Sequence, residues 1–134
     1  MTTLLICNAL CIATLDDTRR ELRNASIYIE GHRIIAIAAA EELAHHAATA
    51  DEVIDARGHL VTPGLVNTHH HMYQSLTRAI PQTQDAELFG WLRGLYPIWA
   101  GLTPDMVYTS TQVAMAELLM SGCTTSSDHL YIYP

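Results

Sequence analysis

The sequence of 134 residues has no lysine, and its seven arginines are outnumbered by fourteen Asp and Glu residues, which gives a formal net charge of −7. Nucleic-acid binding needs clustered cations that contact phosphates, and a helix on a membrane surface needs a basic face. The arginines are instead scattered along the chain. We therefore expect neither a nucleic acid nor a membrane among the partners.

Cysteines and long apolar runs are also scarce. Cys7, Cys11 and Cys123 are too few and too unevenly spaced for a disulfide framework, so buried thiols in a reducing compartment are expected. The apolar stretch 4–15 lacks the basic start and the cleavage site of a signal peptide. No apolar run reaches the roughly 18 residues that cross a bilayer. We predict a soluble, cytoplasmic protein.

Apolar residues make up 49% of the chain and charged residues 16%, which is enough for one modest core. The first part of the chain alternates short β-type runs with turns. Gly31–His32 indicates a hairpin, and residues 41–48 indicate a short helix. The predicted strands are 4–6, 12–15, 26–30, 33–38, 53–56 and 59–62.

The pattern changes after Pro63–Gly64, where a brief apolar strand at 65–68 leads into three consecutive histidines. Two helices are predicted next. Asp85 is a candidate N-cap for the first, whose apolar residues recur at helical spacing over 88–99. Thr103, followed by proline, is the predicted N-cap of the second helix, and Gly122 is its predicted end.

Residues 123–128 predict a second strand, which makes a strand–helix–strand unit with parallel strands. A sheet of two parallel strands leaves one face and both edges uncovered. We therefore expect residues 1–134 to be the front part of a longer protein of the α/β class.

His69 and His71 are the main candidates for chemistry. Residues i and i+2 of a strand project to the same face, so the two imidazoles can converge on one metal ion while His70 points away. Imidazole nitrogen is a good zinc ligand, and the pair lies at the C-terminal end of its strand, where parallel α/β folds place their sites. The alternative is that the three histidines only cap the strand through backbone hydrogen bonds.

The segment PGLVNTHHH at 63–71 resembles the first-strand signature of the amidohydrolase superfamily. IYIEGHRIIAI (27–37) and IDARGHLVT (54–62) are similar to strands of its accessory β-sandwich. Three further segments, 69–81, 88–92 and 116–134, are most similar to bacterial 8-oxoguanine deaminases, with guanine deaminases and triazine aminohydrolases as near relatives.

The resemblance implies two domains: β-sandwich strands at 1–62, and at 63–134 the start of a (β/α)8 barrel that this chain does not complete. It implies a metal-dependent hydrolytic deamination of an aminopurine-type ring, such as 8-oxoguanine to urate and ammonia. One zinc or iron ion would be held by His69, His71 and ligands from later strands. The acid–base glutamate would also lie later, so this segment alone is predicted to be inactive. The resemblance also implies that the full-length protein forms a homo-oligomer.

Three residues are candidates for substrate binding, Gln74 by the same resemblance and Trp91 and His129 by their positions. The amide of Gln74 suits a purine edge because it both donates and accepts hydrogen bonds, although a solvated helix start would also place a glutamine there. Trp91 can stack on the substrate, but its helical spacing equally suits core packing. His129, after the second strand, is a candidate pocket residue, and Tyr131 and Tyr133 are candidates for the pocket entrance.

Two rival hypotheses remain at this stage. The chain could belong to a cyclic amidase of the same fold, which hydrolyses a ring amide instead of releasing ammonia. It could also be a non-catalytic module that uses its histidine cluster to bind a metal and to oligomerise.

Overall fold

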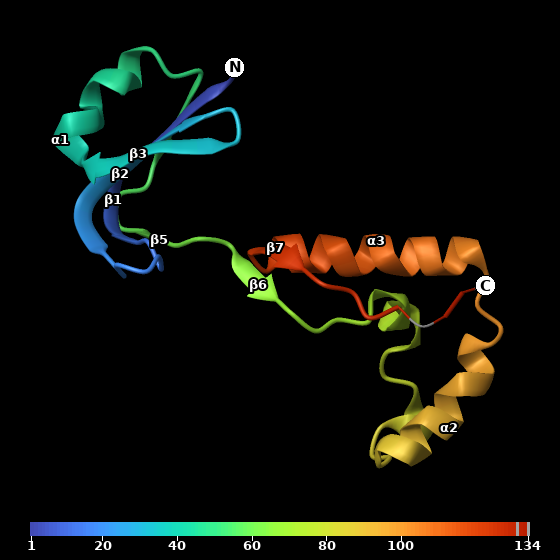
Figure 1. The fold of residues 1–134 in the computed structure, drawn as a ribbon. Coiled ribbons are helices and arrows are strands. Elements are labelled where there is room, and N and C mark those ends of the chain that lie inside the picture. Colours follow the sequence, from blue (N-terminus) through green and yellow to red (C-terminus); the bar gives the residue numbers. More distant parts are fainter. Residues whose placement is uncertain (131, 134) are drawn as a thin grey trace. The chain divides into compact units, whose positions relative to one another are not determined.

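The computed structural model describes residues 1–130, 132 and 133. The chain divides into two compact units, Met1–Pro63 and Gly64–Pro134 (Figure 1). None of the helices in the described part of the chain is long and apolar enough to span a bilayer.

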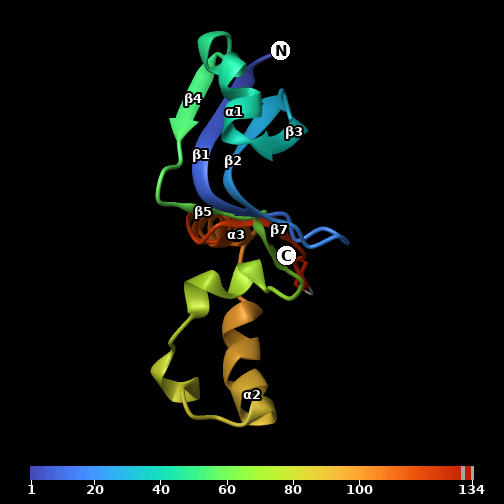
Figure 2. The same cartoon turned by 90° about the vertical axis from the view of Figure 1, so that its left-hand side faces the viewer.

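The first unit is built on one five-stranded sheet in the order β3-β2-β1-β4, with β5 also pairing with β1. Strands β1, β2 and β3 are antiparallel neighbours, whereas β4 and β5 run parallel to β1. Figure 2 shows β1 and β2 as long, curved strands that lie side by side. The elements of this unit are β1 (Thr3–Ala13), β2 (Glu21–Glu30), β3 (Arg33–Ala39), the helix α1 (Ala40–Leu43), the 3-10 helix η1 (Ala44–Ala48), β4 (Glu52–Asp55) and β5 (Leu60–Val61).

The prediction of two separate strands at 4–6 and 12–15 was wrong, because β1 runs through both. The pairing of β1 with β2 shifts register between Ile6 and Ala9, which is a bulge. Asn8 lies in this bulge with φ of 58°, a left-handed conformation that asparagine tolerates better than most residues. β1 therefore continues through residues 7–11, which separate the two predicted strands. The hairpin at Gly31–His32 is confirmed by the antiparallel pairing of β2 with β3.

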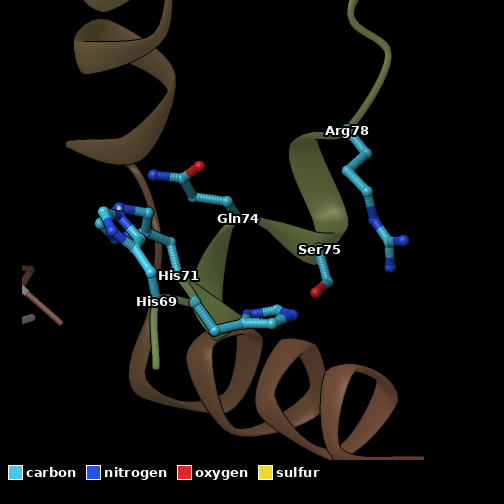
Figure 3. Close-up of a pocket in the computed structure, with 6 residues that line it drawn as sticks. His69, His71, Gln74, Ser75 and Arg78 are labelled. Carbon is cyan, nitrogen blue, oxygen red and sulfur yellow. Dashed lines mark hydrogen bonds between the residues drawn. The ribbon is translucent and has the colours of Figure 1, made fainter. Parts of the chain in front are cut away.

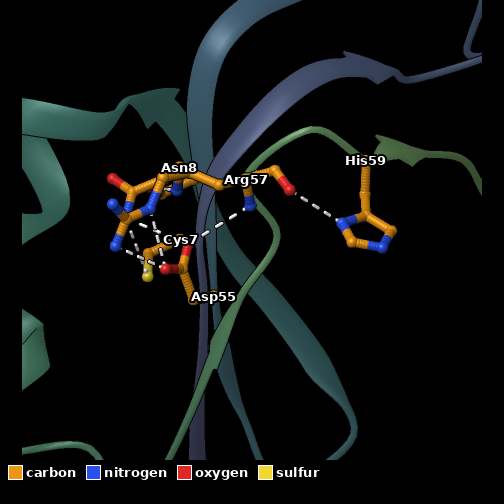
Figure 4. A network of polar contacts seen from close by, with 6 residues as sticks. Cys7, Asn8, Asp55, Arg57 and His59 are labelled. Carbon is orange, nitrogen blue, oxygen red and sulfur yellow. Dashed lines mark hydrogen bonds and ion pairs between the residues drawn. The ribbon is translucent and has the colours of Figure 1, made fainter.

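A polar network fixes the bulge of β1 to the end of β4 (Figure 4). The Asn8 side chain donates to Asp55 Oδ1 at 3.3 Å, and the Arg57 guanidinium pairs with Asp55 Oδ2 at 2.6 Å. These donors, Arg57 foremost, hold the pKa of the Asp55 carboxyl below its usual value. The backbone carbonyl of Arg57 in turn accepts a hydrogen bond from His59 Nδ1 at 2.9 Å, so His59 has a structural contact in this unit.

Both faces of the first sheet are covered by small apolar clusters, as expected for strands whose side chains alternate between faces. One cluster contains Ala9, Ile12, Ala25, Ile27 and Ala56. The other contains Leu5, Tyr28 and Leu43, so the short helix α1 packs on that face.

The second unit contains a two-stranded parallel sheet of β6 (Leu65–Asn67) and β7 (Cys123–Ser126), as predicted (Figure 1). A close approach precedes β6, because a Cβ on Gly64 would clash with the Thr124 side chain. Glycine is therefore needed where the chain enters this sheet. Both sheets of the molecule are open, and the described residues do not close a barrel.

Four helical segments connect β6 to β7, rather than the two that the sequence predicted. They are the 3-10 helices η2 (Met72–Thr77) and η3 (Pro81–Thr83) and the α-helices α2 (Leu88–Trp99) and α3 (Pro104–Met120). In Figures 1 and 2, α2 extends away from α3 rather than lying along it. The path from β6 to α2 therefore turns twice, through η2 and then η3, before α2 begins.

The ends of α3 agree with prediction, but the start of α2 does not. Thr103 Oγ1 accepts from the backbone N–H of Met106 at 3.3 Å, and Gly122 takes a left-handed φ of 82° beyond the helix end. For α2 the predicted cap, Asp85, was wrong. Glu87 occupies the N-cap position and makes no side-chain capping bond.

The core of the second unit is aromatic. Tyr73, Leu95 and Trp99 are almost fully buried together. The Tyr73 and Trp99 rings meet edge to face with centroids 5.4 Å apart, and Trp99 Nε1 donates to Thr77 Oγ1 at 3.0 Å. This cluster ties α2 to η2, the segment that directly follows the three histidines.

Candidate metal and substrate site

The histidines lie just beyond β6, which ends at Asn67, one residue before the predicted end of the strand, so His69 and His71 are not the strand residues that were expected. The Asn67 side chain provides the reason, because its Oδ1 accepts from the backbone N–H of His69 at 3.0 Å. An asparagine that bonds two residues ahead forms an Asx turn, which diverts the backbone from the strand. The three histidines therefore occupy irregular backbone at the C-terminal end of the strand.

His69 and His71 nevertheless converge. Their Nε2 atoms are 3.2 Å apart, and their rings are inclined at 74°. His71 Nδ1 lies 2.7 Å from the backbone carbonyl of His129. Because a carbonyl can only accept, Nδ1 carries the proton, and the lone pair of His71 is on Nε2, which faces His69.

This geometry fits a zinc ion. Two nitrogens bound to tetrahedral zinc at about 2.0–2.1 Å are about 3.3 Å from each other, close to the observed separation of the two Nε2 atoms. Within the described residues, no group of three or more His, Cys, Asp or Glu side chains is placed to hold a metal. The described residues thus bring two imidazole nitrogens together without a third candidate ligand.

The His129 ring lies beside this pair. It stacks on His69 with centroids 4.5 Å apart, and its centroid is 5.7 Å from that of His71. His70 behaves differently, because its Nδ1 atom is buried without a hydrogen-bond partner among the described residues.

A cavity of about 260 Å³ opens at the histidines (Figure 3). Figure 3 shows the Gln74 amide on the same side as the His69 and His71 rings, with Ser75 and Arg78 on the other side. The Arg78 guanidinium is 2.6 Å from the Glu117 carboxylate of α3, so Arg78 forms an ion pair with that helix. The lining residues are His69, His70, His71, Gln74, Ser75 and Arg78.

A second cavity of about 230 Å³ shares Gln74 and Arg78 with the first and is lined on another side by Trp91. Trp91 also packs edge to face on Trp99 at 5.3 Å, so it contributes to the aromatic cluster and to a cavity wall at once. The Gln74 amide donates to the Tyr73 hydroxyl at 2.9 Å. Gln74 therefore lines both cavities, and Trp91, another predicted substrate contact, lines the second.

The structure also identifies polar residues that sequence reasoning missed or assigned only loosely. Ser110 of α3 is fully buried and donates to the backbone carbonyl of Met72 at 2.8 Å. Ser127 donates to the Thr68 carbonyl at 2.7 Å, and Asp128 accepts from the Met72 N–H at 2.8 Å. A serine on the same face of α3 as buried Ala114 was an available signal for Ser110.

Of the two tyrosines near the C-terminus, the structure describes only Tyr133. Tyr133 is exposed, and its hydroxyl donates to the backbone carbonyl of Leu130 at 3.1 Å. Tyr131 lies outside the described residues.

Comparison with known proteins identifies the family of the chain. The sequence profile of the Amidohydrolase family matches residues 60–133, more than half of the chain. The chain belongs to the Amidohydrolase family.

Individual relatives are enzymes that act on nitrogen heterocycles. The 8-oxoguanine deaminase of Pseudomonas aeruginosa is 59% identical over 80 residues, which are 60% of this chain and 18% of that protein. The hydroxydechloroatrazine ethylaminohydrolase of Pseudomonas sp. (strain ADP) is 45% identical over 84 residues, 61% of this chain and 18% of that protein. The chain therefore spans about a fifth of the length of these relatives.

Among solved structures, the atrazine chlorohydrolase of Arthrobacter aurescens TC1 in complex with zinc superposes with a TM-score of 0.86. It is 34% identical, and the match covers 96% of this chain and 29% of that one. The homologous enzymes are thus hydrolases of carbon–nitrogen bonds outside peptides or of related ring substituents, and a structural neighbour binds zinc.

Proposed function

We propose that residues 1–134 form the first part of a zinc-dependent aminohydrolase, with 1–62 contributing to an accessory β-sandwich and 63–134 to the start of a (β/α)8 barrel. The proposed reaction is the hydrolytic deamination of 8-oxoguanine to urate and ammonia. Support for this substrate comes from the 59% identity to an 8-oxoguanine deaminase.

The observation behind the proposal is the paired Nε2 atoms of His69 and His71, 3.2 Å apart, with the His71 tautomer set by the His129 carbonyl. A bound zinc ion would supply Lewis acidity that activates a water molecule for attack on the amino-bearing ring carbon. The two histidines bind the metal in neutral form, and further ligands come from other parts of the complete protein.

The substrate would lie in the 260 Å³ cavity beside the histidine pair. There the Gln74 amide would donate to and accept from the edge of the purine, and Trp91 would limit its extent from the second cavity. His129, whose ring stacks on His69, is not among the residues that line either cavity and takes no part in these proposed contacts. No carboxylate is among the described residues that line the first cavity. Proton transfer to the leaving ammonia is therefore assigned to a residue outside 1–134, and the isolated segment is expected to be inactive.

The test uses the complete protein that contains this segment, with urate formation and zinc content measured on the same samples. His69→Ala and His71→Ala should each lose most of the zinc and the activity together, because a metal ligand is removed in each. His32→Ala is the matched control, since His32 is exposed in the hairpin of the first unit. Full activity in either ligand variant would refute the assignment.

Aminated triazines are a second candidate substrate class, favoured by the 45% identity to an ethylaminohydrolase. The ratio of kcat/KM for 8-oxoguanine to that for an amino-substituted triazine decides between the two. A ratio below one would indicate that a triazine rather than 8-oxoguanine is the substrate, and it would not affect the proposed role of the metal.

A further inference from the structure

The histidine pair stands on irregular backbone, so something other than strand pairing must hold it. The ladder between β6 and β7 ends at Asn67 and Ser126. We propose that three side chains from later in the chain, Ser110, Ser127 and Asp128, form a clamp that orients His69 and His71 for metal binding. This inference rests on the proposed function, because it assigns the pair to a metal.

The first part of the clamp acts just before His69. The backbone N–H of Ser127 donates to the Asn67 carbonyl at 3.0 Å, which adds one bond beyond the end of the sheet. The Ser127 hydroxyl then donates to the Thr68 carbonyl at 2.7 Å. A side-chain bond thus replaces the strand pairing at the residue that precedes the first histidine.

The second part acts within the motif through the backbone of His129. Its N–H donates to the His70 carbonyl at 2.8 Å, and its carbonyl accepts from His71 Nδ1 at 2.7 Å. The direction of the His71 ring therefore depends on where the segment 127–129 places this carbonyl. Hydrogen bonds of this kind fix the orientation of metal-binding histidines.

The third part acts immediately after His71. The carboxylate of Asp128 accepts from the Met72 N–H at 2.8 Å, and the buried hydroxyl of Ser110 donates to the Met72 carbonyl at 2.8 Å. Both backbone polar groups of Met72 are thus held by side chains, one from the end of β7 and one from α3. The same Ser110 oxygen accepts from the Leu76 N–H at 3.3 Å, which extends the restraint along η2.

Together these bonds hold the backbone on both sides of the histidine pair, at Thr68 and at Met72. The Nε2 separation of 3.2 Å is therefore set by the protein before a metal binds. If the backbone at Thr68 or at Met72 were less restrained, the two rings could diverge. Metal binding would then have to realign the rings, and the affinity for the metal would be lower. Ser110, Ser127 and Asp128 are positioning residues, since none of them lines the cavity at the histidines.

The test measures the zinc dissociation constant of the complete protein by competition with a chromophoric chelator, and the visible absorption of the cobalt-substituted protein. Asp128→Ala should weaken zinc binding by about 10- to 100-fold, the usual effect of removing a residue that orients a metal ligand. Asp128→Asn should stay within a few-fold of wild type, because its amide oxygen can still accept from Met72. The cobalt spectrum should change in the alanine variant alone.

A pair of neighbouring serines supplies the matched control. Ser127→Ala removes the hydroxyl bond to the Thr68 carbonyl and should weaken zinc binding. The Ser126 hydroxyl, among the described residues, bonds to the adjacent Ser127 carbonyl, at 3.3 Å. Ser126→Ala should therefore bind zinc as wild type does. Thermal midpoints of the metal-free proteins show whether a loss of affinity arises from general unfolding.

The outcomes separate the clamp from the proposed function. If His69→Ala abolishes zinc binding but Asp128→Ala and Ser127→Ala bind zinc as tightly as wild type, the clamp is wrong and the metal assignment stands. If His69→Ala keeps its zinc, both are wrong. Should Asp128→Ala fail to fold, the comparison of Ser127→Ala with Ser126→Ala decides by the same criterion.

Discussion

Two glycines of α2 provide a sharp test of the packing beside the second cavity. Alanine is favoured over glycine in a helix by roughly 0.5–1 kcal/mol, so Gly→Ala is stabilising wherever space allows. A Cβ on Gly90 would lie 3.6 Å from Ala86 Cβ, an ordinary contact. A Cβ on Gly94 would lie 2.6 Å from Thr83 Cγ2, which is too close.

The contact at Gly94 cannot be relieved cheaply, because Thr83 is buried and anchored. Thr83 is only 6% exposed, and its hydroxyl donates to the Ile80 carbonyl at 3.2 Å. Overpacking of this kind costs about 1–3 kcal/mol, which exceeds the gain in helix propensity. We expect Gly90→Ala to stabilise α2 by about 0.5–1 kcal/mol and Gly94→Ala to destabilise it by about 1 kcal/mol.

Hydrogen exchange followed by mass spectrometry reads out this local stability in the complete protein. Exchange of α2 amides should slow by about 2- to 5-fold in Gly90→Ala and accelerate by about 5-fold in Gly94→Ala, since 1.4 kcal/mol corresponds to a factor of ten. Thr83→Ser removes Cγ2 and keeps the hydroxyl, so it should rescue Gly94→Ala. Equal protection in the two alanine variants would refute the reasoning.

Two further predictions concern single polar groups. Arg57 holds the pKa of Asp55 below its usual value, so the stabilisation from this carboxylate is complete above about pH 4 and lost as the pH falls through the lowered pKa. The gap in thermal midpoint between wild type and Asp55→Asn should therefore narrow from pH 7 to pH 3, and a constant gap would contradict this. Because His70 Nδ1 is buried without a described partner, His70→Phe should leave the free energy of urea unfolding unchanged or raise it by up to about 1 kcal/mol. A loss of more than about 1 kcal/mol would mean that Nδ1 has a partner.

Local signals in the sequence predicted the local structure well. Thr103 and Gly122 marked both ends of α3, and Gly31 marked the hairpin of the first sheet, because each of these positions requires a particular residue type. The N-cap of α2 was mispredicted, because a residue type that suits a cap does not by itself determine where a helix begins. Asp85 is a good capping residue, but the helix begins three residues later at Leu88, after the turn of η3.

Interruptions of a strand were harder to predict than its existence. Asn8 lies between the predicted strands 4–6 and 12–15, yet its left-handed φ of 58° lets β1 continue through a bulge. Asn67 looked like part of a strand, yet its side chain turns the backbone at His69. The same residue type extends one strand and ends another, and the difference depends on pairing partners distant in sequence: Ala25 opposite the bulge and Ser126 opposite the strand end.

In the candidate site, too, the local sequence pattern could be predicted, whereas the contacts between residues distant in sequence could not. His69 and His71 could be predicted because their spacing is a local pattern, although the geometry that was expected to align them, a strand reaching the first histidine, is absent. Their alignment comes instead from bonds that span 56 residues between Met72 and Asp128 and 59 residues between Thr68 and Ser127. A short motif therefore predicts which atoms would meet a metal. The residues that hold those atoms in place depend on tertiary structure, and in the sequence they resemble ordinary polar residues of a helix or a surface. For this reason the effect of the clamp on metal affinity, rather than the loss of the histidines, is the more demanding test of how this site is built.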